Sequence, residues 1–526
     1  MFQQSKQLGC LVVIFLIIAI VLRFINLDQK AYWNDETFTS LQLSGYTPAE
    51  VINQIADGRI VGMEDLQKYQ YPKPGAGKTI IDTIEGLATI EPQHSPLYFA
   101  IARYWVEWMG SSVYIIRSLS VLISLLIFPG IYWLCLELFQ SPIVGAMTVI
   151  LLAVSPFHLV YGQEARPYSL WTVTILMSCA SCLRALRLQT QTSWMVYTLS
   201  VILSLYTFLL SILVHAGQVI YIAISPRFQG DKRLKAYLIS SGLGYLLFLP
   251  WLYLVLTKVP EIEAQAGNFR TQRLPLAEYS LQWLHRLTLF FFDFNLKVKS
   301  SLVYLIPAGM MALALLILVG SGIYFMVKTS SKRVWLFVIT LIFTPAIALT
   351  LPDLIWGGQR GINARYLIPS YLGIQLTVGY LLGTKLANLS AGLRQKKVWT
   401  AVTVGIICIG LLSCMSYLRS QVWWIKVYNN INIEIATIIN QVEQPLVVSD
   451  TWVVNVLSLS HQLEKKVQFQ LVVEPNIPKI PNGFSEIFLY QPSPSLMAGL
   501  ATEYNLKPVR TPWIWQLTNK KATIKL

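Results

Sequence analysis

Two adjacent carboxylates, Asp35 and Glu36, stand a few residues after the first strongly apolar segment of the chain, in the sequence "WNDETF". Asn34 is a good helix N-cap, so the pair is expected in the first turn of a short helix. Carboxylates in that turn often only complement the helix dipole. A carboxylate at a membrane surface can also act as a general base that takes a proton from an attacking hydroxyl. The pair alone leaves both interpretations open.

Other polar and ionisable residues stand beside apolar segments further along the chain. They are His94 before "SPL", Gln163, Glu164, Arg166 and Tyr168 in the turn "GQEARPY", and Arg365 and Tyr366 in "NARYLIP". Ionisable side chains at a membrane boundary are candidates for function by default. A surface histidine is usually only a surface residue, however, and Glu164 and Arg166 can simply neutralise one another. The case for a site depends on whether these residues share one face of the membrane.

Arginine is the informative residue type in this set. Its planar guanidinium donates two parallel hydrogen bonds and so holds a phosphate bidentately. A lipid phosphate lies at the depth at which these apolar segments end. Carboxylates, a histidine and phosphate-binding arginines on one face match a reaction in which a lipid-linked phosphate is the leaving group.

The stretch "PKPGAGKT" resembles the end of a P-loop but does not fit that motif. Pro72 stands where the motif requires glycine, and no predicted strand precedes it. A nucleotide site is therefore not expected here. Lys73 and Lys78 remain candidates to meet a phosphate head group.

The elements that must position these residues are predicted to be membrane helices. Of the 526 residues, 54% are hydrophobic and only 13% are charged, which excludes an ordinary soluble protein. The net charge of +15 is explained by lysine and arginine in cytoplasmic loops, so nucleic acid is not an expected partner. Cys179 and Cys182 are spaced like metal ligands, but without a second pair they are expected to pack in the core.

Eleven segments, give or take two, are long and apolar enough to span a bilayer or nearly so. They are 8–25, 113–136, 143–160, 168–183, 194–209, 210–225, 236–256, 301–327, 334–351, 366–384 and 398–417. The stretch 194–225 is either one long helix or two short ones that turn near Ser211. Segment 96–109 is too short to span and carries Arg103 and Glu107, so it is expected to lie in the membrane interface.

The distribution of basic residues predicts the orientation of the chain. With the N-terminus in the cytoplasm, the basic loops at 184–187, 227–235, 328–333 and 394–397 all fall on the cytoplasmic side. The candidate site residues and the C-terminal tail then fall on the extracytoplasmic side. The expected location is the plasma (inner) membrane.

The C-terminal tail differs in character from the rest of the chain. "PLVVSD", "VQFQLVV" and "EIFLYQ" are predicted strands that alternate with helix-like segments, which is typical of a small α/β domain. We therefore expect an all-α polytopic membrane domain over residues 1–418, in which 26–112 forms an extracytoplasmic loop with interfacial helices. Residues 419–526 are expected to form a soluble extracytoplasmic α/β domain.

These motifs, in this order, resemble those of the GT-C superfamily of membrane glycosyltransferases, and in particular glycosyltransferase family 39. The matching features are the Asp35-Glu36 pair after the first span, "HSPL", "SPFHLVYGQEARPYSL" after the third span, and "RYLIP" before a late one. The resemblance covers roughly residues 8–385. The family includes protein O-mannosyltransferases and lipid A aminoarabinose transferases, and bacterial members with "QEARPY" look most similar.

The resemblance implies an inverting transfer of a sugar from a polyprenyl-phosphate donor to an acceptor on the external face of the membrane. Asp35 would be the general base, and Glu36 would support the acceptor or the sugar. The residues implied to hold the donor phosphate are Arg365, Tyr366, Lys73, Lys78 and Arg166, and further substrate-binding candidates are His94, Gln163, Glu164 and Tyr168. Glu164 is nearest to a second acid of the family, but "QEARPY" departs from the mannosyltransferase pattern and puts that role in doubt.

No cofactor is required in principle, because arginines can meet the charge of the leaving phosphate. Adjacent carboxylates can bind Mg²⁺ or Mn²⁺, but a divalent metal is not favoured. A transporter or flippase of lipid-linked sugars is the alternative function, and it predicts charges through the membrane depth and internal repeats. A non-catalytic scaffold that acts through the tail is a third. The sequence does not identify the sugar, or whether the acceptor is a glycan, a lipid or a protein.

Overall fold

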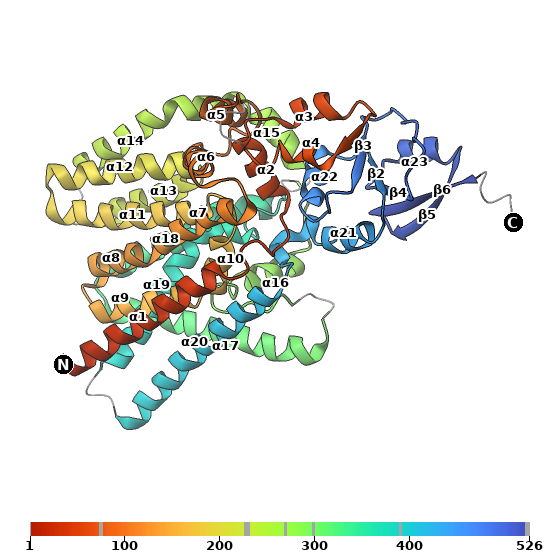
Figure 1. Cartoon of the computed structure of the whole chain (residues 1–526). Helices are drawn as coiled ribbons and strands as arrows, with labels where there is room; N and C mark the ends of the chain where they lie inside the picture. The colour runs from red at the N-terminus through yellow and green to blue at the C-terminus, as the bar shows by residue number, and fades with distance from the viewer. Residues whose placement is uncertain are drawn as a thin grey trace. The chain divides into compact units, whose positions relative to one another are not determined.

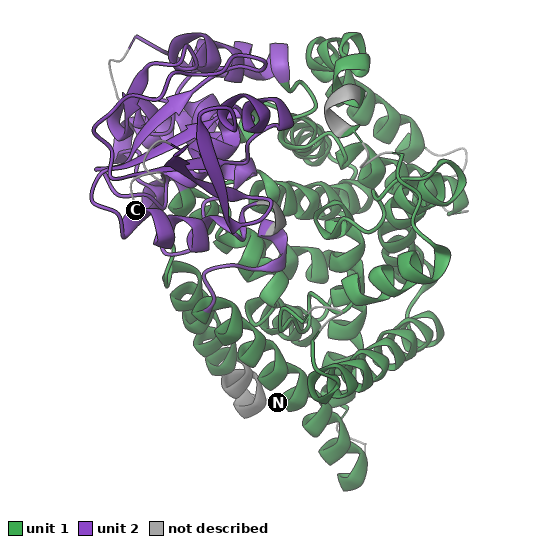
Figure 2. Ribbon diagram, turned by 90° about the vertical axis from the view of Figure 1, so that its right-hand side faces the viewer, with its two compact units in different colours: residues 1–27, 91–98, 117–419 green, residues 28–90, 99–116, 420–526 purple. Residues whose placement is uncertain are grey.

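The computed structural model describes residues 2–72, 77–225, 232–267, 271–296, 300–388 and 392–520. Lys73 and residues 226–231 of a predicted basic loop lie outside the described residues. The chain forms two compact units, which Figure 2 colours separately. Unit 1 consists of Met1–Leu27, Glu91–Tyr98 and Arg117–Arg419, and unit 2 consists of Asp28–Ile90, Phe99–Ile116 and Ser420–Leu526.

Unit 1 is built almost entirely from helices (Figure 1). They are α1 (Phe2–Phe24), α7 (Val113–Leu125), α8 (Ile127–Phe139), α9 (Pro142–Ala153), α10 (Pro156–Gly162), α11 (Tyr168–Leu188), α12 (Gln191–Thr207), α13 (Ser211–Ile224), α14 (Lys232–Thr257), α15 (Val259–Ala266), α16 (Leu276–Arg286), α17 (Leu302–Thr329), α18 (Lys332–Trp356), η3 (Ala364–Leu367), α19 (Ile368–Ala387) and α20 (Leu393–Arg419). Each of the eleven predicted apolar segments coincides with one helix or with two consecutive helices. The stretch 194–225 forms two helices, α12 and α13.

Many of these helices can cross a membrane. Among the described residues, six helical segments are each long and apolar enough, and α9 with α10, bent by 62°, make a seventh if they form one span. All of these belong to the predicted set. Of the four other predicted segments, 8–25 and 210–225 correspond to shorter apolar helices, and 194–209 and 366–384, in α12 and α19, are not among the segments that are long and apolar enough. The part of the chain that the structure describes therefore offers six or seven spans where eleven are predicted. The chain is therefore a multi-pass membrane protein, and its predicted fold class is confirmed.

Glycines let two helices of unit 1 approach closely. A side chain at Gly379 of α19 would collide with Oγ1 of Thr148 in α9, and a Cβ at Gly383 would lie 3.0 Å from Cα of Val144. Small residues are typical of helix packing in membranes, where van der Waals contact drives association. This packing holds α19 in place, directly after the 3₁₀ helix η3 that contains Arg365.

Unit 2 contains a six-stranded sheet with the strand order β1-β3-β2-β4-β6-β5. The strands are β1 (Ile60–Gly62), β2 (Pro445–Ser449), β3 (Gln468–Leu471), β4 (Glu486–Tyr490), β5 (Tyr504–Arg510) and β6 (Ile514–Asn519). β2 is parallel to β3 and β4, and the other pairs are antiparallel. The α/β character predicted for the tail is confirmed, and its three predicted strands are β2, β3 and β4.

The core of unit 2 joins the segment after the first span to the tail. Its helices are α2 (Asn34–Leu43), α3 (Pro48–Ile55), α4 (Met63–Gln67), α5 (Ile80–Ile90), most of α6 (Leu97–Met109), η4 (Trp424–Asn429), α21 (Asn432–Asn440), α22 (Val453–Ser460) and α23 (Pro494–Leu500). Leu41 of α2 and Val51 of α3 share a buried cluster with Val454 and Leu457 of α22. β1 also comes from this early segment. The boundary predicted at residues 418–419 stays a prediction.

Candidate active site

The carboxylates Asp35 and Glu36 lie in the first turn of α2, as predicted. The helix begins at Asn34, and Trp33 before it has extended backbone angles, φ −99° and ψ 172°. Asn34 is therefore the first helical residue rather than the predicted N-cap, and its side chain makes contacts to the tail instead. This arrangement presents two neighbouring carboxylates at the positive end of a helix.

The two carboxylates have different surroundings. Glu36 is fully buried, and its Oε2 lies 3.1 Å from Nζ of Lys426, which is itself 1% exposed. The ammonium of Lys426 also lies 6.0 Å from the ring centroid of Trp33. Asp35 is only half-buried. Glu36 is thus engaged inside unit 2, whereas Asp35 is the carboxylate with partial access to the surface.

Asn34 ties α2 to two further residues of the tail. Its Nδ2 donates to Oδ1 of Asn455 at 2.8 Å, and its Oδ1 accepts from Nδ2 of Asn429 at 2.8 Å. Oδ1 of Asn429 also accepts from the Asn34 backbone N–H at 2.9 Å. Lys426, Asn429 and Asn455 are not among the residues predicted from the sequence to form the site. One signal was available, since Lys426 stands among aromatic and apolar residues in "WWIKVY", where a lysine needs a partner.

Lys78, a predicted phosphate ligand, is engaged with two carboxylates of unit 2. Its Nζ lies 3.1 Å from Oε1 of Glu50 and 3.5 Å from Oδ1 of Asp82, and 5.0 Å from the ring centroid of Tyr46. Partial desolvation opposes the charged form, but hydrogen bonds and attraction from Glu50 and Asp82 outweigh it and raise the pKa of Lys78. Lys78 is therefore a firmly held cation.

His94 and Arg166 meet in unit 1, although they are far apart in sequence. Arg166 is 3% exposed, and its Nη2 donates to Nε2 of His94 at 3.4 Å. His94 is half-buried. A buried guanidinium in a membrane protein is a candidate for function by default.

Arg365 lies against a group of aromatic rings in unit 1. Its guanidinium is 5.6 Å from the ring centroid of Tyr168 and 5.6 Å from that of Tyr366. The ring centroid of Tyr168 is in turn 5.1 Å from that of Tyr161. Aromatic faces stabilise a cation while leaving its N–H groups able to donate. Three of the predicted residues, Tyr168, Arg365 and Tyr366, therefore come together.

Gln163 and Glu164 are both buried, at 2% and 1% exposure. Nε2 of Gln163 donates to the carbonyl oxygens of Leu22, Arg23 and Ile25, at 3.3, 3.0 and 3.0 Å. These are carbonyls at the C-terminal end of α1, which have no partners within the helix. Gln163 therefore closes the end of α1, which is a structural contact and not the predicted contact with substrate.

The loop before Arg365 is organised around one buried carboxylate, Asp353. It accepts from Nη1 of Arg360 at 2.9 Å, from the hydroxyl of Tyr279 at 3.0 Å and from the backbone N–H of Gly361 at 2.7 Å. The side chain of Asp353 is 0% exposed. Arg360 thus neutralises Asp353, and Arg365 is the arginine of this loop that lies against the aromatic rings.

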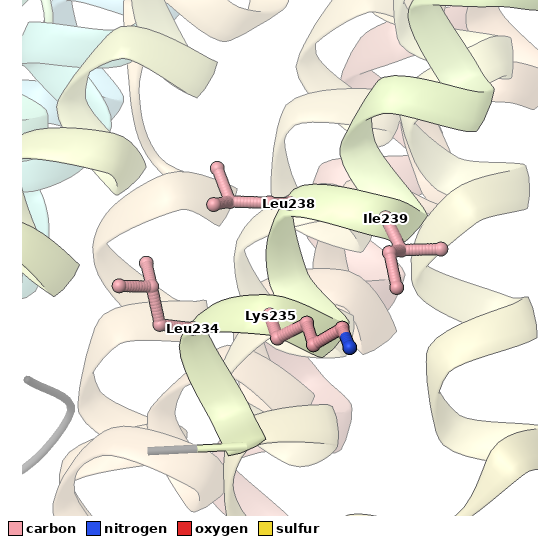
Figure 3. A pocket seen from close by; sticks show the side chains of 4 residues that line it. All are labelled: Leu234, Lys235, Leu238 and Ile239. Carbon is pink, nitrogen blue, oxygen red and sulfur yellow. The ribbon is translucent and has the colours of Figure 1, made fainter. Parts of the chain in front are cut away.

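Among the described residues, no group of three or more His, Cys, Asp or Glu side chains is arranged to hold a metal ion. A depression on α14 is lined by Leu234, Lys235, Leu238 and Ile239 (Figure 3). Leu238 and Ile239 are 53% and 61% exposed, as expected for side chains that face lipid. None of the predicted site residues lines this depression, so it is not the candidate site.

No protein-family model matches the chain, and no curated protein matches it significantly. Solved structures are similar. ArnT from Cupriavidus metallidurans in the apo state is 13% identical, with a TM-score of 0.51 over 97% of this chain and 98% of that chain. The Archaeoglobus fulgidus oligosaccharyltransferase in the apo form is 12% identical, with a TM-score of 0.52 over 89% of this chain and 64% of that chain. Archaeal oligosaccharyltransferase AglB from Archaeoglobus fulgidus, in complex with an inhibitory peptide and a dolichol-phosphate, is 11% identical, with a TM-score of 0.53 over 100% of this chain and 76% of that chain. The chain therefore has the GT-C type of membrane fold.

Proposed function

We propose that this protein is an inverting glycosyltransferase that moves a sugar from a polyprenyl-phosphate donor to an acceptor on the extracytoplasmic face of the membrane. By its motifs we place it nearest to glycosyltransferase family 39. The observation that carries the proposal is the pair of arginine sites in unit 1, Arg166 with His94 and Arg365 with Tyr168 and Tyr366. The solved AglB complex, which has the same type of fold, contains a dolichol-phosphate.

The arginines are assigned to the donor. A lipid-linked phosphate becomes more negative as its bond to the sugar breaks, so cations that contact it stabilise the transition state more than the ground state. Arg365 can donate bidentately while its face rests on aromatic rings. Arg166, which is already largely desolvated, adds a second positive charge. No metal ion is needed to meet the charge of the departing phosphate in this scheme.

Asp35 is assigned as the general base. It takes the proton from the acceptor hydroxyl, and the oxygen attacks the anomeric carbon from the side opposite the phosphate. A new glycosidic bond forms, the bond between the anomeric carbon and the phosphate oxygen breaks, and polyprenyl phosphate leaves. The configuration at the anomeric carbon is thereby inverted. Glu36, through its ion pair with Lys426, is assigned to hold the first turn of α2 and so the position of Asp35.

The proposed topology places the N-terminus in the cytoplasm of a cell with a plasma (inner) membrane, and the C-terminal segment outside. The positive-inside distribution of lysine and arginine supports it. A topology reporter fused after Lys397 should be cytoplasmic, and one fused after Asn519 should be extracytoplasmic. The reverse result would contradict the assigned face of the membrane.

The function is tested by donor cleavage. Purified full-length protein in lipid nanodiscs is incubated with a panel of polyprenyl-phosphate sugars and a mixture of glycan, lipid and peptide acceptors, and released polyprenyl phosphate is measured. We expect release by the wild type, a loss of about 10²-fold or more in Asp35→Asn, and no change in Asp57→Asn, an exposed carboxylate in the same unit. Equal release by wild type and Asp35→Asn would contradict the proposal. Movement of an intact donor across the bilayer without release would favour the flippase alternative.

A further inference from the structure

The parallel strands of unit 2 form a switch point next to β2. The chain leaves β2 through α22 to reach β3 on one side, and later forms β4 on the other side of β2. α22 contributes to one buried cluster of the sheet, with Val447, and α23 contributes to the other, with Val448. Helices on opposite faces diverge at such a point and leave a crevice outside the carboxyl ends of the strands, which is where open α/β sheets bind ligands.

A cavity of about 120 Å³ lies at this edge of the sheet. Its lining consists of Ile52, Ala56, Ser449, Asp450, Thr451, Trp452, Val453, Val456, Leu471, Val472 and Val473. Trp452 is 46% exposed, although it lies only three residues after the end of β2 and lines the cavity. The crevice therefore combines an accessible indole with a carboxylate and a hydroxyl.

The crevice adjoins the helix that carries Asp35. The ring centroids of Trp452 and Phe38 lie 5.1 Å apart. Asp35 and Phe38 are three residues apart in α2 and so share one side of that helix. A second connection runs from Asn455 at the start of α22 to Asn34, at 2.8 Å. A ligand on the indole of Trp452 would lie beside the face of α2 from which Asp35 projects.

We propose that this crevice binds a saccharide, and that the saccharide is the sugar acceptor of the proposed transfer reaction. The inference rests on the proposed function. The C–H groups on one face of a pyranose pack on an indole, while its hydroxyls need donors and acceptors at the rim. Asp450 already accepts from the backbone N–H of Ser493 at 2.9 Å and from the hydroxyl of Ser493, but a carboxylate accepts about four hydrogen bonds and retains capacity. The hydroxyl of Thr451, next to it, donates to Oε1 of Gln491 at 3.2 Å and accepts from Nδ2 of Asn455 at 3.3 Å, so it offers a sugar one further acceptor position.

Two other acceptor classes fit the crevice less well. No lysine or arginine is among its lining residues, and the carboxylate of Asp450 would repel a phosphorylated lipid head group. An extended peptide gains most of its affinity from hydrogen bonds to an unpaired strand edge, whereas the crevice lies at the ends of β2 and β3, both of which are paired on each side. A neutral, hydroxyl-rich ring meets neither obstacle.

The experiment measures binding without a donor. Full-length protein in nanodiscs is mixed with p-nitrophenyl pyranosides of glucose, galactose, mannose and N-acetylglucosamine, or with a Ser/Thr-rich peptide, and contact is detected by saturation-transfer NMR. We expect at least one pyranoside to bind the wild type. Its affinity for Trp452→Ala should be weaker by about tenfold or more. Its affinity for Trp452→Phe should be intermediate, because that variant keeps a ring against Phe38. Trp108→Ala is the matched control, because Trp108 is a 79% exposed tryptophan in the same unit.

Three results would overturn the proposal: binding of no pyranoside by the wild type, equal binding by Trp452→Ala, or binding of the peptide in place of the sugars. Thermal unfolding of each variant separates loss of the crevice from loss of the fold. Because the readout needs no donor, its failure is distinguishable from failure of the transferase function. If the protein binds a pyranoside through Trp452 but releases no polyprenyl phosphate from any donor, the transferase function is contradicted and the saccharide site is supported.

Discussion

The ammonium of Lys426 lies 3.1 Å from the carboxylate of Glu36, and the two side chains are 1% and 0% exposed. The pair joins η4, at the beginning of the tail, to the first turn of α2. Burying two charges is costly unless their geometry is good, so this contact, together with the hydrogen bonds of Asn34, constrains how α2 sits in unit 2. Asp35 is the residue next to Glu36 in this turn, so the contact also helps to fix the position of Asp35.

Lys426→Met should destabilise unit 2 strongly. The substitution removes the cation from beside a buried carboxylate, and breaking a buried pair costs about 3–5 kcal/mol. Thermal unfolding of the purified protein, followed by intrinsic fluorescence, would show a lower midpoint. The double variant Glu36→Met with Lys426→Met removes both charges and should recover much of the loss. If the single and double variants unfold at the same temperature, the pair does not contribute as described.

Arg365→Ala should weaken donor binding by about tenfold or more, because the guanidinium is assigned to the donor phosphate. Arg365→Lys should restore little, since an ammonium cannot donate bidentately. The measurement is the KM for the polyprenyl-phosphate donor. Arg184→Ala is the control, because Arg184 is 49% exposed and lies beside Glu137. An unchanged donor KM in Arg365→Ala would contradict the assignment.

Arg360→Met should act on stability and not primarily on donor affinity. Asp353 would lose its cation, and although Tyr279 and Gly361 still donate to it, the cost should be about 2–3 kcal/mol. Thermal unfolding in the same nanodiscs compares this variant with Arg365→Met, for which we expect a smaller shift. If the two variants lose stability equally, the distinction drawn between the two arginines fails.

Gln163→Leu should lower stability while leaving donor affinity nearly unchanged. The variant loses the donor that serves the carbonyls of Leu22, Arg23 and Ile25, and leaving buried carbonyls unsatisfied costs about 1–3 kcal/mol. Gln282→Leu, in α16, is a matched glutamine substitution outside these contacts. The measurements are the unfolding midpoint and the donor KM. A large rise in donor KM at full stability would show that Gln163 binds substrate instead.

Unit 2 should lose stability in acid through the carboxylates around Lys78. Burial raises the pKa of Glu50, but hydrogen bonds from Thr47 and Lys78 outweigh this effect and lower that pKa. A backbone hydrogen bond from Thr79 and the charge of Lys78 lower the pKa of Asp82. A carboxyl group with a lowered pKa binds fewer protons when folded, so its contribution is present above the unfolded pKa of about 4 and is lost as the pH falls through the folded value.

The check is the unfolding midpoint of wild type and Lys78→Met between about pH 6 and pH 3. The variant lacks the cation, so its midpoint should fall less steeply in acid than that of the wild type. The difference should be small, because these groups are partly exposed and screened. Parallel curves for the two proteins would show that Lys78 does not hold the carboxylates.

The periodic and local features of this protein could be read from its sequence. Apolar runs of about 20 residues specify membrane helices, because a helix satisfies its own backbone hydrogen bonds in lipid. All eleven runs are helical in the structure, and six or seven of them are long and apolar enough to span a membrane. Alternation of short strands and helices specified the α/β character of the tail. The chemistry of Asp35 and Arg365 as residue types was also visible, because it depends on the side chains themselves.

Tertiary structure alone decided how each polar residue is used. Glu36 and Asp35 are neighbours in one helical turn, yet Glu36 is fully buried against a lysine that lies 390 residues away in sequence, whereas Asp35 is half-buried. Arg360, in the loop before η3, is paired with Asp353, and Arg365, in η3 itself, lies against aromatic rings. Burial and partners arise from contacts between distant segments, which no local pattern encodes. The sequence determined which groups are available for chemistry, and the fold determined which of them are engaged in holding the structure.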